Sequence, residues 1–383
     1  MSYIRKYQFI LIIFLLCSCG FNRNAVHQAE SEYDIETCPV NEGLDERYVP
    51  DKLLICSESK WIMSAWNMDE NRKTFFLSED KGCSWKHKSD FEKWWYCEAL
   101  VYDGGAVYCS LRDMNCDNET IRSGKIRRSA DFGESWDELC VFDAEIKHLL
   151  VQDSTIAVQL CNITKKETKK TVDIKYSINI SNDLGKSWRE LELPNTFTLD
   201  FSIDKIILRF YNDNEHLYVI TPEQQHIDTI LRESSSIVNV VKGEDVIGVW
   251  EGHRANFYKV EDGGLSLRSS VRDVLKPGRN QIPAEIYQYG DVVYTKIIPL
   301  TYDAKMTTLM STDGAKTWRR VDLSCPFEKQ LDSTYIPDRN WPMAGYKESM
   351  VSYCVGYRDG RRQDYIKILR PKKNTSEGLR GCR

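Results

Sequence analysis

The sequence predicts an all-β fold made of repeated four-stranded antiparallel units. An octapeptide with the pattern S-x-D-x-G-x-[ST]-W occurs at residues 78–85, 129–136 and 181–188, so its copies begin about 50 residues apart. Short runs of alternating apolar and polar residues surround each copy, and no stretch has the 3.6-residue period of a helix. One structural unit is therefore copied along the 383-residue chain.

Each octapeptide is expected to form the turn of a β-hairpin. The Asp accepts hydrogen bonds from backbone N–H groups, the Gly supplies a backbone conformation that other residues resist, and the Trp packs against the neighbouring unit. Residues repeated for turn geometry are structural, so we assign them no catalytic role. In the three intact copies they are Ser78, Asp80, Gly82 and Trp85, then Ser129, Asp131, Gly133 and Trp136, and finally Ser181, Asp183, Gly185 and Trp188.

Two further copies are less regular. Residues 311–318 differ from the pattern only in the position of the glycine, and residues 260–267 keep the Asp, the Gly and a closing apolar residue. The retained residues are Ser311, Asp313 and Trp318 in the first of these copies and Asp262 and Gly264 in the second. The fourth unit has lost its motif near residues 221–223.

A second, looser hairpin alternates with the octapeptide hairpins. We place it at residues 52–66, 98–112, 147–162, 199–212, 237–252, 285–299 and 346–358. Four strands per unit make the blade of a single β-propeller, with seven blades favoured and six as the alternative. The last blade has one clear further strand at residues 364–369, so a strand within residues 31–45 could complete it and close the ring.

The octapeptides resemble the Asp-box, or BNR repeat, of the sialidase-like β-propellers. This resemblance implies a fold more than an activity, because the family includes sialidases, other glycosidases, sorting receptors, assembly factors and binding proteins. Its sialidases share an early Arg-Ile-Pro element, which is absent here, and residues 47–50 are a poor substitute. The expected function is therefore non-catalytic protein binding as an adaptor, assembly factor or toxin-neutralising protein. A sialidase-type exo-glycosidase or a glycan-binding protein is the alternative.

The chain begins with a predicted signal peptide at residues 1–18. Two basic residues precede an apolar stretch that is too short to span a bilayer, and the sequence Leu16-Cys17-Ser18-Cys19 follows. That tetrapeptide resembles the bacterial lipobox, which implies lipidation of Cys19 and an outer-membrane lipoprotein facing the periplasm or the cell surface. An ordinary secretory signal is the alternative. The remaining segments are a tether with the closing strand (19–45), the propeller (46–371) and a tail (372–383).

Cysteines are frequent for an exported chain and are expected to form disulfides. The chain has 13 of them. Spacing suggests the local pairs Cys83 with Cys97, Cys109 with Cys116, Cys140 with Cys161, and Cys325 with Cys354. Cys38, Cys56 and Cys382 compete for any remaining bond, and a bridge between Cys38 and Cys382 would clasp the two ends of the ring.

The composition argues against a nucleic-acid partner, because the formal net charge is −5. No cofactor or metal is expected, since the acidic run at residues 113–119 lacks the central glycine of a calcium loop. A protein partner in the cell envelope is favoured, a glycan is the alternative, and membrane contact is expected through the lipid alone. The candidate binding residues lie on two connections between blades, where they either bind a partner or fill gaps. They are Trp94, Trp95 and Tyr96 on the first and Tyr335, Arg339 and Trp341 on the second.

Overall fold

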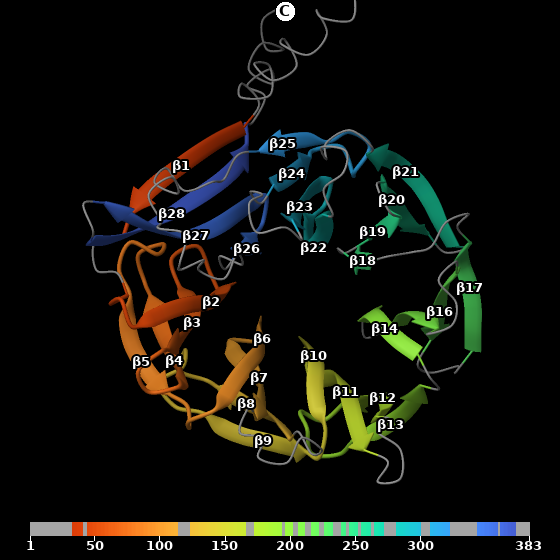
Figure 1. The fold of residues 1–383 in the computed structure, drawn as a ribbon, viewed down its shortest axis with the longest axis horizontal. Coiled ribbons are helices and arrows are strands. Elements are labelled where there is room, and N and C mark those ends of the chain that lie inside the picture. Colours follow the sequence, from red (N-terminus) through yellow and green to blue (C-terminus); the bar gives the residue numbers. More distant parts are fainter. Residues whose placement is uncertain are drawn as a thin grey trace, which may run out of the picture.

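The described strands form seven four-stranded antiparallel sheets, the number that the sequence favoured over six. The computed structural model describes residues 33–40, 44–113, 123–165, 172–193, 196–201, 206–210, 216–221, 226–232, 239–242, 245–251, 254–261, 264–271, 281–299, 307–321, 343–358 and 361–372. Each sheet is one blade, and the blades stand side by side in a ring (Figure 1). The fold is a β-propeller. No helix within these ranges is long and apolar enough to cross a membrane.

The blades follow one another along the chain, each running from its innermost to its outermost strand. The first has β2 (Tyr48–Ile55), β3 (Trp61–Asn67), β4 (Arg72–Ser78) and β5 (Lys86–Asp90). The second has β6 (Trp95–Asp103), β7 (Ala106–Asp113), β8 (Gly124–Ser129) and β9 (Asp137–Phe142). The third has β10 (Glu145–Gln152), β11 (Thr155–Lys165), β12 (Val172–Ser181) and β13 (Arg189–Leu193).

The next three blades repeat this order. The fourth has β14 (Thr196–Phe201), β15 (Ile206–Phe210), β16 (His216–Thr221) and β17 (His226–Arg232). The fifth has β18 (Asn239–Lys242), β19 (Val246–Glu251), β20 (Arg254–Glu261) and β21 (Gly264–Val271). The sixth has β22 (Gln281–Tyr289), β23 (Val292–Pro299), β24 (Thr307–Ser311) and β25 (Arg319–Val321).

The seventh blade joins the two ends of the chain. It contains β26 (Met343–Tyr346), β27 (Ser349–Arg358) and β28 (Arg361–Pro371), and its outermost strand is β1 (Tyr33–Pro39). β1 pairs antiparallel with β28 over its whole length, from Tyr33 opposite Pro371 to Pro39 opposite Tyr365. The closing strand thus comes from the segment to which the sequence assigned it.

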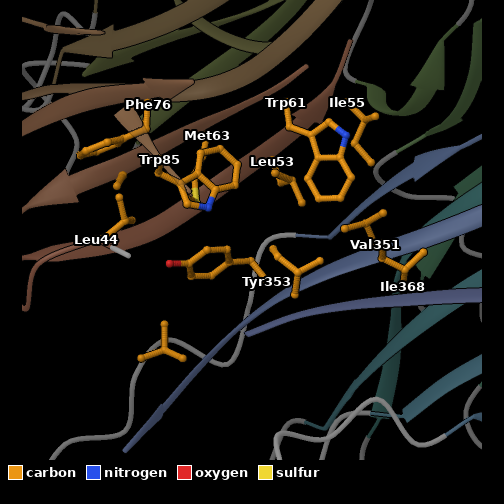
Figure 2. Packing of buried hydrophobic residues seen from close by; sticks show 13 residues of the cluster. Leu44, Leu53, Ile55, Trp61, Met63, Phe76, Trp85, Val351, Tyr353 and Ile368 are labelled. Atoms are coloured by element: carbon orange, nitrogen blue, oxygen red, sulfur yellow. The ribbon is translucent and has the colours of Figure 1, made fainter. Parts of the chain in front are cut away.

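The core lies between neighbouring blades. Between the seventh and first blades, Trp61, Met63 and Trp85 face Tyr353 and Ile368 across the joint (Figure 2). Similar clusters of buried residues join the first blade to the second and the second to the third. Further clusters of described buried residues join the remaining pairs of neighbouring blades, so each blade is stabilised by both of its neighbours.

The octapeptides form one recurrent turn between the third and fourth strands of a blade. In the copy at 78–85, the Ser78 hydroxyl donates to Asp80 Oδ1 at 2.8 Å and accepts the Gly82 N–H at 2.8 Å. The other Asp80 oxygen accepts the Ser84 hydroxyl at 2.7 Å. The copies at 129–136, 181–188 and 311–318 repeat all three bonds at 2.5–2.9 Å.

The displaced glycine of the copy at 311–318 leaves this turn unchanged. Two consecutive residues of each of these four copies have a left-handed backbone, for example Lys81 at φ 60° and Gly82 at φ 83°. In the irregular copy these two positions are Gly314 and Ala315, both at φ 66°. Glycine can thus serve at either position, although Ala315 adopts a conformation that non-glycine residues resist.

The copy at 260–267 differs in structure. β20 ends at Glu261 and β21 begins at Gly264 directly opposite it, so the hairpin has no room for the eight-residue turn. Asp262 lies outside the described residues.

Candidate functional site

The two faces of the ring carry different features. Strands alternate in direction within a blade, so the octapeptides lie at the face where the third strand of a blade ends. We call the opposite face, where the innermost strands begin, the strand-start face. The connections from one blade to the next and the turn between the second and third strands lie on it. The first candidate binding residues, 94–96, belong to this face.

The innermost strands of the first three blades each have a β-bulge near their beginning. The additional residues are Asp51 in β2, Glu98 in β6 and Lys147 in β10. A bulge redirects a side chain that would otherwise alternate with its neighbours. Three charged side chains thereby occur at equivalent positions of consecutive blades. The sequence does not mark these bulges, because the extra residue is identified only by the strand opposite.

Asp51 is part of a compact ionic and aromatic cluster. Lys73 on β4 is almost fully buried, and its Nζ lies 2.6 Å from Asp51 Oδ2 and 4.2 Å from the centroid of the Tyr96 ring. The Tyr96 hydroxyl donates to Asp51 Oδ1 at 3.0 Å. Burial, together with the Asp51 carboxylate, raises the pKa of Tyr96. The cluster connects the first blade to the beginning of the second.

Arg112 on β7 extends this network to the third blade. Its Nε lies 2.8 Å from Glu98 Oε1 and its Nη1 donates to Glu145. Lys147 Nζ also pairs with Glu145, at 2.8 Å. Burial raises the pKa of Glu98, whereas hydrogen bonds from Lys147 and Arg112 outweigh burial and lower the pKa of Glu145.

Two carboxyl groups whose pKa values move in opposite directions are typical of acid–base pairs in glycosidases. The Glu145 side chain, however, is 0% exposed, and two cations bind it. A sugar could reach it only by displacing Arg112 and Lys147, which would leave buried charges unpaired. The network therefore serves to hold three blades together and does not present an acid–base pair to solvent.

The three aromatic residues at 94–96 have different surroundings. Tyr96 packs within the ionic cluster, and Trp95 packs against the core between the first two blades, with Lys125 Nζ 3.9 Å from its ring centroid. Trp94 is 41% exposed. Two of these candidate binding residues thus fill space between blades and one faces solvent. Tyr335, Arg339 and Trp341 lie outside the described residues.

Trp94 is held firmly although it is exposed. Its φ of 70° is left-handed, which is unusual for a bulky residue, and its N–H donates to the Asn71 carbonyl at 2.9 Å. Asn71 closes the turn between β3 and β4, and Met68 in that turn is 47% exposed. The Met68 N–H donates to the Arg47 carbonyl at 2.9 Å. Backbone bonds thus fix the connection and the turn that carry these two apolar side chains.

We call Met68, Asp69, Lys93 and Trp94 the corner patch; all four are exposed. Met68 and Asp69 were not singled out from the sequence, because a turn that begins with Asn is common and does not by itself indicate a binding surface. Asn67 does indicate a turn at this position, because its Oδ1 accepts the Asp69 and Glu70 N–H groups at 3.1 and 3.2 Å.

The predicted disulfides are not formed among the described cysteines. The pair Cys83–Cys97 is wrong, since both cysteines are free. Cys97 is fully buried in the core between the first two blades, whereas Cys83 is half-buried and lies in the octapeptide turn of the first blade. The pair Cys140–Cys161 is wrong because both cysteines are free, Cys140 on β9 of the second blade and Cys161 on β11 of the third. Cys161 hydrogen-bonds Tyr176 instead.

The other cysteine predictions involve residues that the structure does not describe. Cys109 is fully buried, and Cys354 lies 3.8 Å from the Ser352 hydroxyl. Their predicted partners, Cys116 and Cys325, lie outside the described residues, as do Cys382 and the predicted lipidation site Cys19. No group of metal-ligating side chains occurs within the part of the chain that the structure covers.

No protein-family model matches the chain, and no curated protein matches its sequence. Solved structures share its fold. The acylaminoacyl peptidase of Pyrococcus horikoshii is similar at a TM-score of 0.51 and 9% identity, over 83% of this chain and 52% of that one. A xyloglucanase from Xanthomonas campestris gives 0.49 at 9% identity, over 85% and 54% of the two chains. The propeller domain of the Trilobed protease from Pyrococcus furiosus gives 0.48 at 10% identity, over 84% and 95%. At these identities the likeness concerns the fold alone.

Proposed function

We propose that this chain is a non-catalytic, protein-binding Asp-box propeller that is exported and anchored to the bacterial outer membrane through a lipid on Cys19. Its partner is a protein of the cell envelope, which it serves as an adaptor, assembly factor or neutralising protein. The corner patch on the strand-start face is the proposed contact surface.

The rigid presentation of Trp94 carries this proposal. Tryptophan is prominent among the residues that dominate binding energy at protein interfaces, because it buries a large apolar area with few rotatable bonds. Here it is exposed on a connection whose backbone is pinned by the Asn71 carbonyl. A residue kept in a left-handed conformation costs about 1–2 kcal/mol, and such strain is concentrated at functional positions.

The charged groups of the strand-start face agree with binding better than with hydrolysis. Asp51, Glu98 and Glu145 are each engaged by a cation from β4, β7 or β10. A rigid scaffold of this kind positions its loops and leaves recognition to the residues exposed on them. We therefore place the contact at the blade connections and not at the buried carboxylates.

Affinity capture with matched variants tests the proposal. Mature protein carrying Cys19→Ser is immobilised and exposed to envelope extract, and bound proteins are identified by mass spectrometry. A single saturable partner is expected, and Trp94→Ala should weaken its binding at least about tenfold. Tyr289→Ala is the control, because Tyr289 is 46% exposed at the end of β22, on the octapeptide face. Equal binding by both variants, or no partner at all, would reject this surface.

Glycan recognition is the competing proposal, since an exposed tryptophan can also stack on a sugar ring. A panel of fluorogenic sialosides and glycosides separates the two classes. Turnover that is lost in Glu145→Gln would show that the buried carboxylate network is catalytic and would overturn the binding proposal.

A further inference from the structure

Two cysteines that are distant in sequence meet where the ring closes. Cys38 lies on β1, directly opposite Ile366 of β28. A Cβ placed on Gly82 would lie 2.8 Å from Ile366 Cγ1, so the octapeptide of the first blade packs against this rung of the seventh. Cys83, the next residue, forms a hydrogen bond with the Cys38 thiol.

These two thiols differ from the buried cysteines of the core. Cys38 and Cys83 are half-buried, whereas Cys97 and Cys109 are fully enclosed between the first two blades. Glu36 Oε1 accepts the Cys38 S–H at 3.5 Å. Burial, this hydrogen bond and the Glu36 charge raise the pKa of Cys38. A partly exposed thiol beside a second thiol is open to thiol–disulfide exchange, and an enclosed one is not.

We propose that Cys38 and Cys83 are a disulfide-forming pair that covalently fastens the closing strand β1 to the first blade. Both are thiols in this structure. The oxidant is a disulfide, either a small one such as oxidised glutathione or that of a disulfide-donating protein. The inference does not depend on the proposed partner or on the corner patch.

The reaction proceeds by two exchanges. The Cys83 thiolate attacks the donor disulfide, forms a mixed disulfide and releases one donor thiol. The Cys38 thiolate then attacks Cys83 Sγ, which forms the Cys38–Cys83 bond and releases the second donor thiol. The protein loses two electrons and two protons, and the donor disulfide is reduced to two thiols. Burial raises the pKa of both thiols, and the Cys38 S–H is in addition held by Glu36, so we place the first attack at Cys83.

The position of the bond gives it a structural effect. β1 pairs with β28 on one side only, and most of its residues are exposed. It is the element through which the N-terminal end of the chain completes the ring. A crosslink from β1 to Cys83 closes a loop of chain in the unfolded state and so favours the folded ring.

A peptide map tests the pair. The full chain is incubated with oxidised glutathione, alkylated during unfolding and digested with trypsin without reduction. Cleavage after Lys and Arg places Cys38 in the peptide 24–47 and Cys83 in 82–86, while Cys97 and Cys109 share the peptide 94–112. We expect 24–47 linked to 82–86, and 94–112 alkylated at both cysteines. Recovery of 24–47 and 82–86 as separate alkylated peptides would overturn the proposal.

Thermal unfolding of variants gives a second readout. In oxidised protein, Cys38→Ser and Cys83→Ser should lower the unfolding midpoint equally, and the double variant should lower it no further. Excess dithiothreitol should abolish these differences. Cys140→Ser is the control, since Cys140 is also half-buried but lies on β9. If oxidised and reduced protein still differed in unfolding midpoint in either single variant, another cysteine pair would be responsible for the stabilisation.

Discussion

Two left-handed residues in each of the four octapeptides that form the recurrent turn determine which substitutions that turn accepts. Glycine takes this conformation without strain, whereas a residue with a Cβ pays about 1–2 kcal/mol. The surroundings of the turn add a second effect. A Cβ on Gly82 would meet Trp61 and Ile366 at 2.8 Å, whereas a Cβ on Gly133 would have its nearest neighbour at 3.7 Å.

We therefore expect Gly133→Ala to lower the free energy of unfolding by about 1–2 kcal/mol and Gly82→Ala to lower it by more. Ala315→Gly, the reverse change, should raise it by less than about 1 kcal/mol, because relief of strain is partly offset by the greater freedom of glycine in the unfolded chain. Urea unfolding measures all three changes, provided that the dependence of the free energy of unfolding on urea concentration is the same in each variant. Equal losses for the two glycine variants would contradict the contact of Gly82 with the seventh blade.

The octapeptide carboxylates make stability depend on pH. The pKa of Asp131 is about 2: burial opposes ionisation, but hydrogen bonds from the Ser135 hydroxyl and N–H and from Ser129 outweigh it. Because the pKa of Asp131 is lower in the folded protein than in the unfolded chain, its ionised form stabilises the fold above about pH 4. This contribution is lost as the pH falls toward 2.

Asp131→Asn should therefore lower the free energy of unfolding at pH 7 and reduce its decline between pH 4 and pH 2. Urea unfolding at pH 7 and pH 3 makes the comparison. Asp137→Asn, at an exposed carboxyl just beyond the turn, is the control for the loss of one carboxylate. If the free energy of unfolding fell equally with pH in the Asp131 variant and in the parent protein, the turn carboxylate would not contribute to the pH dependence of stability.

Among the elements, β28 has the largest role in closing the ring. It pairs with β1 and β27, and Arg362 at its beginning reaches the first blade. Arg362 Nη1 donates to the carbonyls of Asp45 and Tyr48 at 2.9 and 2.7 Å. Its Nε donates to Asp364, whose side chain is 2% exposed. Burial raises the pKa of Asp364, so the carboxylate depends on this cation.

Arg362→Met should lower the free energy of unfolding by about 3–5 kcal/mol, because it leaves the buried Asp364 carboxylate without its cation and two carbonyls without their donor. The Tyr353 hydroxyl would remain the donor to Asp364. Arg361→Met is the matched control: Arg361 is the preceding residue and is exposed, so its replacement should cost less than about 0.5 kcal/mol. Denaturant unfolding measures both. Similar losses for the two variants would mean that Arg362 does not hold the joint between the blades.

At the scale of the molecule, the blades should unfold as one unit. Clusters of buried apolar side chains join every pair of neighbouring blades, and β1 joins the last blade to the beginning of the chain. Arg362→Met in the seventh blade and Gly133→Ala in the second should shift the same single transition. Tryptophan fluorescence and far-ultraviolet circular dichroism should give coincident curves for each variant. Two transitions, each moved by only one variant, would show that the ring opens in parts.

Features that depend on contacts between residues close in sequence were predicted, and features that depend on contacts between distant residues were not. The octapeptide turn is local: Ser78, Asp80 and Gly82 satisfy one another within a few residues, so its geometry follows from the pattern. The alternation of hairpins is also local and led to four strands per blade. The cysteine pairs and the roles of Trp95 and Tyr96 depend on strand neighbours that spacing alone does not reveal.

The sequence by itself determined the repeated blade, the turn chemistry and the segment that supplies β1, because hydrogen bonds within a turn and the two-residue period of a strand require only neighbouring residues. Tertiary structure alone decided the inter-blade ionic network, the exposure of Trp94 and the meeting of Cys38 with Cys83. Each of these depends on closing the ring, which brings together blades that are far apart along the chain, and packing in that ring sets which side chains are buried.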